Sequence, residues 1–252
     1  MEETKQDIKY NKLCDLVVLG NIANIGTEIL IDQKRKELEK VFAPFYLDYA
    51  KRNIDDDRYY LQLLYHVTSL KLDEKKNIAS VITRNLKNEI IRYVDKRNKD
   101  NKQIPNHQYI DRKKENAIFN VNKGGILTTL HIITESMNCG LRYDMSSIPI
   151  RQETIEICDY YKINAYRLMT NEVYIFCVEN YFNFKNTLFD LLDRKIGHKK
   201  EIVKVKEFID KYMVCIGELN NAKDKIRTDV DTESFLEKSY QDELERIEGI
   251  QL

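Results

Sequence analysis

The stretch of residues 116–178 constrains the fold most, because its hydrophobic period changes several times within a short distance. It predicts, in order, a strand, a glycine turn, an amphipathic helix, a short strand, a helix led by Pro149 and a final strand. The face of the first helix is formed by Ile126, Leu130, Ile133 and Met137. Alternating segments of this kind predict an α+β fold, in which a mixed sheet is covered by helices.

The glycine turn contains the only Gly-Gly pair of the sequence, Gly124-Gly125, directly before the apolar helical face. Two adjacent glycines at a strand-to-helix junction allow positive φ angles and a close approach of another group to the backbone. The first N–H groups of the following helix lack partners within the helix and can receive an anion. The pattern therefore fits either a tight connection or an anion site.

Three motifs in the same stretch resemble one protein family. They are FNVNKGG at 119–125, ESMNCG at 135–140 and IPIRQETIEIC at 148–158. In this order they resemble the C-terminal domain of the aminoimidazole ribonucleotide (AIR) synthetase-related proteins, and most of all their hydrogenase-maturation branch. The resemblance implies an AIR synthetase C-terminal-domain-like fold. It also implies a phosphate- or ligand-binding group made of Asn120, Asn122, Lys123, Gly124 and Gly125, and a substrate face that carries Arg151 and Glu153.

The sequence departs from the family pattern where charged groups are expected. The family's His-Asp pair before the glycines is replaced by Phe119-Asn120, and its glutamate by Lys123. An amide in place of a carboxylate removes a charge that can hold a metal or accept a proton. In the family, ATP is held chiefly by an N-terminal domain, and we expect nothing before residue 14 to supply it. We therefore expect no catalytic residue, no metal ligand and no cofactor for the lone chain, with ATP and Mg²⁺ only if a partner supplies that domain.

The predicted domain organisation is a tail over residues 1–13 and an AIR synthetase-related C-terminal-like domain over 14–252. The domain begins with a strand at 14–20, a helix to about residue 40 with Thr27 as its N-cap, and a helix from Pro44. Residues 56–96 show two apolar helical faces, which predicts a helical insertion, and the polar segment 97–116 predicts an exposed loop. After residue 171, the patterns predict a strand at 172–178, helices ending near 197 and 210, and a strand at 212–218.

Charge and cysteine usage limit the partners and the location. The chain has 41 acidic and 41 basic side chains, so no net field attracts nucleic acid or an anionic membrane. No apolar run is long enough to span a bilayer, and the first residues do not form a signal peptide. The five scattered cysteines contain no CxxC motif. They predict buried thiols in a reducing cytoplasm rather than disulfides or a zinc site.

The remaining catalytic candidates favour structural roles. His131 lies beside apolar residues and is expected to be packed or half-exposed rather than a general base, and His107 is expected to be exposed. Arg151 and Glu153 fit a helix cap and an ion pair better than catalysis.

Three functions remain open. The first is a stand-alone, non-catalytic binding or structural module, expected to be a homodimer. The second is a subunit of an ATP-dependent AIR synthetase-like or hydrogenase-maturation-like enzyme, whose ATP-binding domain is on a separate protein. The third is a small-molecule binding protein that uses the glycine turn as an anion site.

Overall fold

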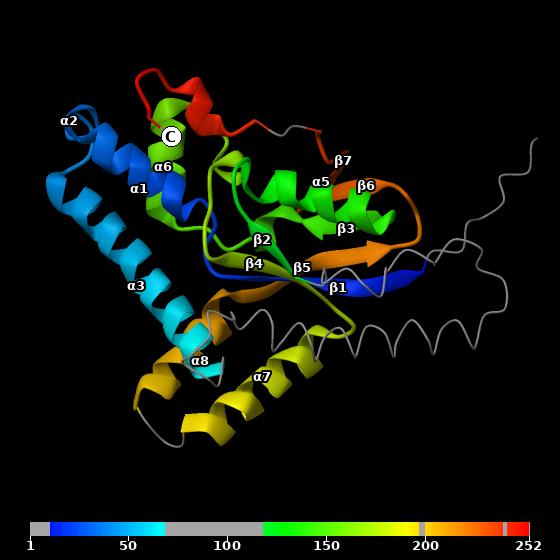
Figure 1. Ribbon diagram of the computed structural model, residues 1–252. Helices are drawn as coiled ribbons and strands as arrows, with labels where there is room; N and C mark the ends of the chain where they lie inside the picture. Colours follow the sequence, from blue (N-terminus) through cyan, green and yellow to red (C-terminus); the bar gives the residue numbers. More distant parts are fainter. Residues whose placement is uncertain (1–10, 69–117, 197–199, 239–240, 252) are drawn as a thin grey trace, which may run out of the picture.

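One seven-stranded sheet organises the chain (Figure 1). The computed structural model describes residues 11–68, 118–196, 200–238 and 241–251. The strands are Lys12–Leu19 (β1), Ile118–Val121 (β2), Gly140–Asp144 (β3), Val173–Val178 (β4), Met213–Asn220 (β5), Lys225–Asp229 (β6) and Thr232–Phe235 (β7). The α-helices are Asn24–Gln33 (α1), Arg35–Leu38 (α2), Pro44–Thr68 (α3), Gly125–Met137 (α5), Gln152–Tyr161 (α6), Tyr181–Ile196 (α7) and Lys200–Tyr212 (α8). Three short 3-10 helices are Met145–Ser147 (η1), Ala165–Arg167 (η2) and Glu243–Arg246 (η3).

The strand order is β2-β4-β1-β5-β3-β6-β7, and every neighbouring pair is antiparallel except β3 with β6. This confirms the predicted mixed sheet and the α+β class. The stretch 116–178 supplies β2, β3 and β4, yet β1, from the beginning of the chain, lies inside the sheet between β4 and β5. Its near-continuous apolar run LCDLVVL suits a strand buried on both faces.

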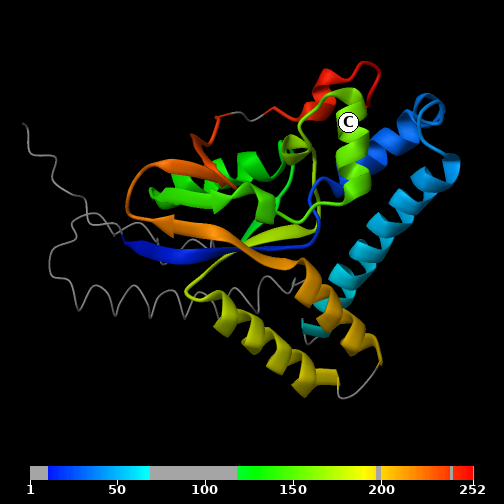
Figure 2. The same ribbon diagram turned by 180° about the vertical axis from the view of Figure 1, so that it is seen from behind.

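The two faces of the sheet are covered by different helices. Successive side chains of β1 point to opposite faces, so Leu16 and Val18 join one core, while Val17 and Leu19 join the other. Helices α1, α5 and α6 complete the first core, and α7, α8 and the end of α3 complete the second. Figures 1 and 2 show α5 and the pair α7–α8 on opposite sides of the sheet.

Helix α3 connects the two helical layers. It runs along one side of the sheet from the neighbourhood of α1 and α6 to α7 and α8 (Figures 1 and 2). The sequence predicts one helix from Pro44 and a separate insertion over 56–96, but the structure has one continuous helix through Thr68. The rest of that predicted insertion, the predicted loop 97–116 and most of the predicted tail 1–13 lie outside the described residues. Among the residues described, no helix has the length and apolar content needed to cross a bilayer.

The beginning of α1 differs from the predicted cap. Ala23, at φ 62°, precedes the helix, and Thr27 lies inside its first turn. The buried Thr27 hydroxyl donates a hydrogen bond to the Ala23 carbonyl over 2.8 Å. Asn24 fixes the helix start instead, because its Oδ1 accepts from the Asn171 N–H at 3.0 Å and its Nδ2 donates to the Asn171 carbonyl at 2.8 Å. Thr27 as N-cap was therefore wrong, and a contact distant in sequence sets the helix start.

Candidate functional site

The glycine turn lies between β2 and α5, as the sequence predicts, and both glycines have positive φ angles, 78° at Gly124 and 66° at Gly125. The space at Gly125 is closed by backbone, since a Cβ there would lie 2.4 Å from the carbonyl oxygen of Tyr166. The turn is also closed on itself, because the Gly125 N–H donates to the Asn122 carbonyl over 3.0 Å. The two glycines are thus required by a tight connection between β2, α5 and η2.

The Gly124 N–H, at the start of α5, is hydrogen-bonded to the carboxylate of Asp242, which lies near the end of the chain. The Gly124 N–H donates to Asp242 Oδ2 over 2.8 Å, and the Leu244 N–H donates to Asp242 Oδ1 over 3.0 Å. Asp242 has no solvent exposure and Leu244 is equally buried. A carboxylate at a helix N-terminus is stabilised by the unpaired N–H groups and by the helix dipole. The chain therefore supplies its own anion at this turn.

The other residues of the predicted ligand group lie at the surface around this contact. Lys123 Nζ forms an ion pair with Glu245 Oε1 at 2.6 Å, and this partner raises the pKa of the lysine. Asn122 is exposed, and its Oδ1 accepts from the Lys123 N–H at 2.9 Å. Asn120 is an exposed residue of the edge strand β2. The structure brings the five residues together, and their role in ligand binding stays a prediction.

Arg151 and Glu153 do not pair with each other, and both are bonded to α3. The Arg151 guanidinium contacts both carboxylate oxygens of Asp57, with Nε 3.0 Å from Oδ2. Asn21 Nδ2 donates to the same Oδ2 over 2.7 Å. Asn53 Nδ2 donates to Glu153 Oε1 over 2.5 Å. Both residues therefore join α6 to α3, and their position on a substrate face also stays a prediction.

The Asp57–Arg151 pair is buried unequally. The side chain of Asp57 is 4% exposed and that of Arg151 is 20% exposed. Burial raises the pKa of Asp57 more than the guanidinium and Asn21 lower it. The guanidinium carbon of Arg151 also lies 5.0 Å from the centre of the Tyr212 ring, within the range of a cation–π contact. Desolvation of the carboxylate thus offsets much of the attraction within the pair.

His131 is packed, as predicted. It is buried on α5, with Nε2 2.8 Å from the Glu237 carbonyl and Nδ1 3.3 Å from Lys225 Nζ. These partners assign the proton to Nε2, because an ammonium group can only donate to Nδ1. Burial lowers the pKa of His131, which keeps the ring neutral.

The cysteines are free thiols, and the structure confirms the predicted burial of most of them. Four are buried and Cys215 is half-buried. Burial raises the pKa of both Cys139 and Cys158 to about 12. Within the described ranges, no group of histidine, cysteine and acidic side chains is arranged to hold a metal ion.

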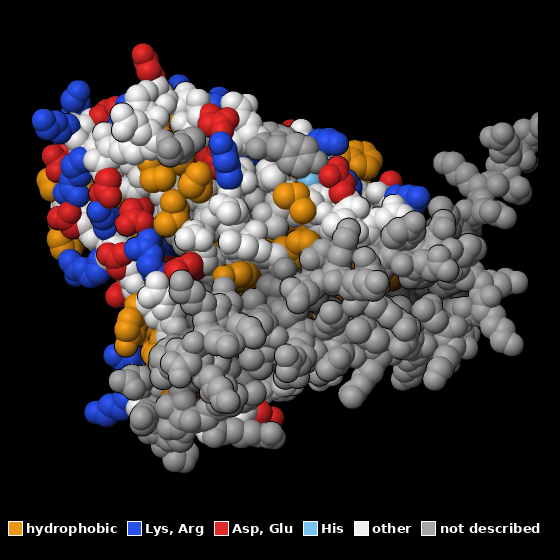
Figure 3. Space-filling view, viewed as in Figure 1, with side chains coloured by type: hydrophobic (Ala, Val, Ile, Leu, Met, Phe, Trp, Pro, Cys, Tyr) orange, Lys and Arg blue, Asp and Glu red, His pale blue; other side chains and the backbone are white. Residues whose placement is uncertain are grey.

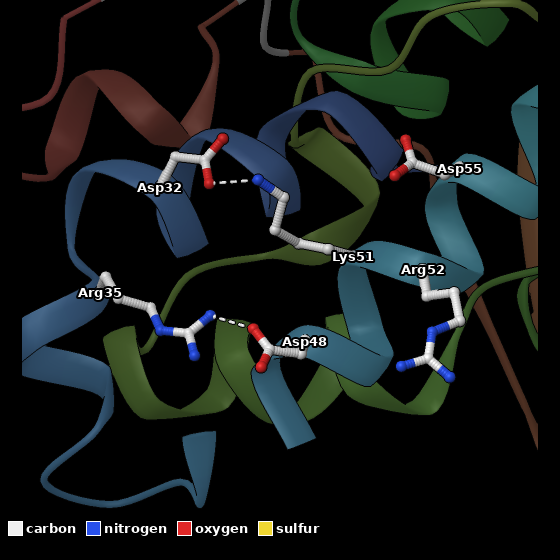
Figure 4. A pocket seen from close by; sticks show the side chains of 6 residues that line it. All are labelled: Asp32, Arg35, Asp48, Lys51, Arg52 and Asp55. Carbon is white, nitrogen blue, oxygen red and sulfur yellow. Dashed lines mark hydrogen bonds and ion pairs between the residues drawn. The ribbon is translucent and has the colours of Figure 1, made fainter. Parts of the chain in front are cut away.

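A charged hollow of about 590 Å³ lies between the α1–α2 segment and α3 (Figure 4). It is lined by three acidic and three basic side chains, Asp32, Arg35, Asp48, Lys51, Arg52 and Asp55. Lys51 pairs with Asp32 at 2.5 Å and Arg35 with Asp48 at 2.7 Å, so most of the charge is neutralised within the hollow. In the space-filling view, basic and acidic side chains alternate with hydrophobic ones along this edge of the molecule (Figure 3). This surface was not among the predicted sites, although the regular spacing of aromatic residues in α3 is visible in the sequence.

A scan of protein-family models finds no match, and a search of curated proteins finds no relative. Solved structures are similar at low identity. The hydrogenase maturation protein HypE of E. coli is 15% identical over 94% of this chain and 52% of its own, with a TM-score of 0.49. The thiamine monophosphate kinase of Aquifex aeolicus is 11% identical over 89% of this chain and 52% of its own, with a TM-score of 0.37. The chain thus spans about half the length of these proteins. Its fold class rests on its own sheet topology.

Proposed function

We propose that this chain is a non-catalytic binding or structural module of the AIR synthetase-related type, which does not bind or hydrolyse ATP by itself. The observation that carries the proposal is the buried Asp242 carboxylate at the start of α5, 2.8 Å from the Gly124 N–H. A phosphate group bound at this turn must displace that carboxylate, since two anions in one buried site repel each other.

The surrounding pairs support the same proposal. Lys123, the cation of the predicted ligand group, is held by Glu245 from the same C-terminal segment. Leu244 lies between Asp242 and Glu245 in the sequence and is fully buried. The C-terminal segment is therefore held by apolar packing as well as by charge. Opening the turn therefore costs the packing of Leu244 in addition to two hydrogen bonds of Asp242.

A thermal unfolding experiment tests the proposal. Saturating Mg-ATP, ADP or inorganic phosphate is expected to leave the melting temperature of the full chain unchanged. A ligand present at ~100 times its Kd adds about 2.7 kcal/mol to stability. For a chain of this size, that corresponds to a rise of roughly 5–10 °C. Such a rise with Mg-ATP would overturn the proposal.

The variant Asp242→Asn tests whether the Asp242 carboxylate keeps phosphate out of the turn. The amide keeps an oxygen acceptor for the Gly124 N–H but removes the negative charge. Phosphate binding that appears only in this variant would support exclusion of anions by Asp242. If phosphate already binds the wild-type protein at the turn, Asp242 does not exclude it.

The second candidate is a subunit of an ATP-dependent enzyme, whose ATP-binding domain and Mg²⁺ are supplied by another chain. It is favoured by two exposed apolar side chains at the β6–β7 hairpin, Val230 and Phe235, which offer a contact surface beside the edge strand. An ATP-binding-domain protein that co-purifies with this chain and hydrolyses ATP only in the complex would establish it. Failure of the two to associate would exclude it.

We also propose a cytoplasmic location. The five free cysteines support it, because buried thiols without disulfides suit a reducing compartment.

A further inference from the structure

The outward face of α3 carries a regular stripe of exposed side chains. The buried positions of the helix are Leu47, Ala50, Ile54, Asp57, Leu61 and Leu64. On the opposite side, the α3 stripe follows intervals of four and three residues in alternation and consists of Phe45, Tyr49, Arg52, Asp56 and Tyr59. This spacing keeps a row of side chains on one side of a helix and is the spacing of a helix–helix seam.

The three aromatic members of the α3 stripe are solvent-exposed. Phe45 is 72% exposed, Tyr49 42% and Tyr59 54%. The rings of Phe45 and Tyr49 are stacked, with centres 6.5 Å apart. Exposed aromatic side chains gathered on one helical face are typical of protein–protein contacts rather than of solvated surface.

The two charged members of the α3 stripe have no ion-pair partner among the described residues. Every other charged side chain that lines the hollow of Figure 4 has one, whereas Arg52 has no dashed line to any residue drawn there. Asp56, one helical turn further along, also lacks an ion-pair partner within the described part of the chain. When a second copy of α3 runs antiparallel to the first, its Asp56 comes opposite Arg52 and its Arg52 opposite Asp56. The charges of two such faces are therefore complementary.

We propose that two copies of this chain form a two-fold symmetric dimer through antiparallel pairing of their α3 stripes. In this arrangement Arg52 lies opposite Asp56 of the partner subunit, and two-fold symmetry makes this ion pair twice. The same register places Tyr49 opposite Tyr59 of the partner subunit, also twice. A parallel pairing in register would place Arg52 against Arg52 and Asp56 against Asp56, so charge complementarity selects the antiparallel orientation.

The acids beside the α3 stripe do not oppose this pairing, because each is neutralised within its own chain. Asp55 pairs with Arg58 at 2.9 Å, and Asp48 pairs with Arg35 at 2.7 Å. The charged hollow therefore contributes ion pairs that are already satisfied at the rim of the interface, beside the aromatic side chains and the two Arg52–Asp56 pairs. The partner of the proposed module is thus a second copy of the same chain, and in that respect the dimer rests on the proposed function.

Sedimentation velocity of the full chain over a range of concentrations tests the dimer. The wild-type protein is expected to dimerise. Arg52→Glu is expected to weaken the dimer about ten-fold or more, because it places a glutamate opposite Asp56 of the partner subunit twice. Asp56→Arg is expected to do the same by pairing two cations. The double variant Arg52→Glu/Asp56→Arg restores opposite charges across the axis, and its dimerisation is expected to return to near the wild-type level.

Two matched controls lie on other helices, outside the α3 stripe. Lys204→Glu reverses an exposed charge of α8 and is expected to leave the dimer unchanged, as is Phe182→Ala on α7, where the ring is 69% exposed. Phe45→Ala is expected to weaken the dimer.

The dimer is overturned if the wild-type protein stays monomeric at about 100 μM, a concentration at which even micromolar complexes form. It is equally overturned if the double variant dimerises no better than the single ones. Nucleotide binding is measured separately on the same samples. A failure of the dimer is therefore distinct from a failure of the proposed function.

Discussion

Removing either member of the Asp57–Arg151 pair is expected to destabilise the fold by unequal amounts. Arg151→Ala leaves a carboxylate whose side chain is 4% exposed, with the Asn21 amide as its hydrogen-bond partner. Breaking a buried ion pair from one side costs about 3–5 kcal/mol, because the remaining charge stays buried. We expect a cost in this range for Arg151→Ala near pH 7.

Removing Asp57 instead of Arg151 is expected to cost less stability. Asp57→Ala leaves a guanidinium whose side chain is 20% exposed and which still faces the Tyr212 ring at 5.0 Å. Because water and the ring both remain available to the cation, we expect a cost of about 1–3 kcal/mol. In the double variant neither charge is left alone, so its cost should be smaller than the sum of the two single costs by about 1–3 kcal/mol.

The cost of Arg151→Ala should also depend on pH. Burial already raises the pKa of Asp57, and removing the guanidinium removes an interaction that lowers it. The folded variant then binds a proton more tightly than the unfolded chain does. Its stability is highest when Asp57 is protonated and falls as the pH rises through the raised pKa. The cost should therefore be smaller near pH 5 than near pH 7.

Urea unfolding followed by circular dichroism, at both pH values, measures all three variants. Glu39→Gln is a suitable control, because its carboxylate pairs with Arg35 at the surface and such pairs contribute at most about 1 kcal/mol. If Asp57→Ala proves more damaging than Arg151→Ala, or if the two costs simply add, the unequal burial of the pair does not govern its energetics.

Three further predictions concern the first core and its thiols. Gly125→Ala should lower the free energy of unfolding by more than about 2 kcal/mol, since a Cβ there meets the Tyr166 carbonyl at 2.4 Å. Gly249→Ala is the control, because its Cβ would meet only Lys34 Nζ at 3.4 Å, and it should cost only the ~1 kcal/mol of its positive φ. Equal melting temperatures of the two variants would contradict this prediction. Because burial lowers the pKa of His131, the protein should lose stability as the pH falls below about 6.5, and His131→Gln should flatten that loss in urea titrations. Cys139 should stay unreactive toward a thiol reagent near pH 8 until the protein unfolds, because burial raises its pKa to about 12; rapid labelling of the native protein would show otherwise.

Much of the secondary structure was predictable because it depends on the local spacing of apolar residues. The strand before Gly124 and the helices led by Gly125 and Pro149 follow directly from the spacing of apolar residues. The continuity of α3 was not predictable in this way, because the change of apolar pattern near residue 56 marks a change of neighbours and not a break in the helix. Its first half packs beside α1 and α6, and its second half beside α7 and α8.

The candidate site was predictable only in part. The glycine turn was found from its two glycines, but its occupant was not, because Asp242 lies 118 residues away in sequence and no local pattern links the two. Arg151 was expected to form an ion pair, and its partner, Asp57, was hidden among the exposed acids of the same helix. The burial of one acid and the exposure of its neighbours are properties of helix packing.

The amino-acid order alone determined the alternation of strands and helices, the need for glycine at the β2–α5 turn and the reduced, buried state of most cysteines. These features depend on neighbouring residues and on the sorting of apolar from polar side chains. Tertiary structure decided that β1 lies inside the sheet between β4 and β5, and that Asp242 fills the start of α5. It also decided that Arg52 and Asp56 remain outside every ion pair in the described residues. Each of these depends on segments far apart in the chain that meet only when the sheet has formed.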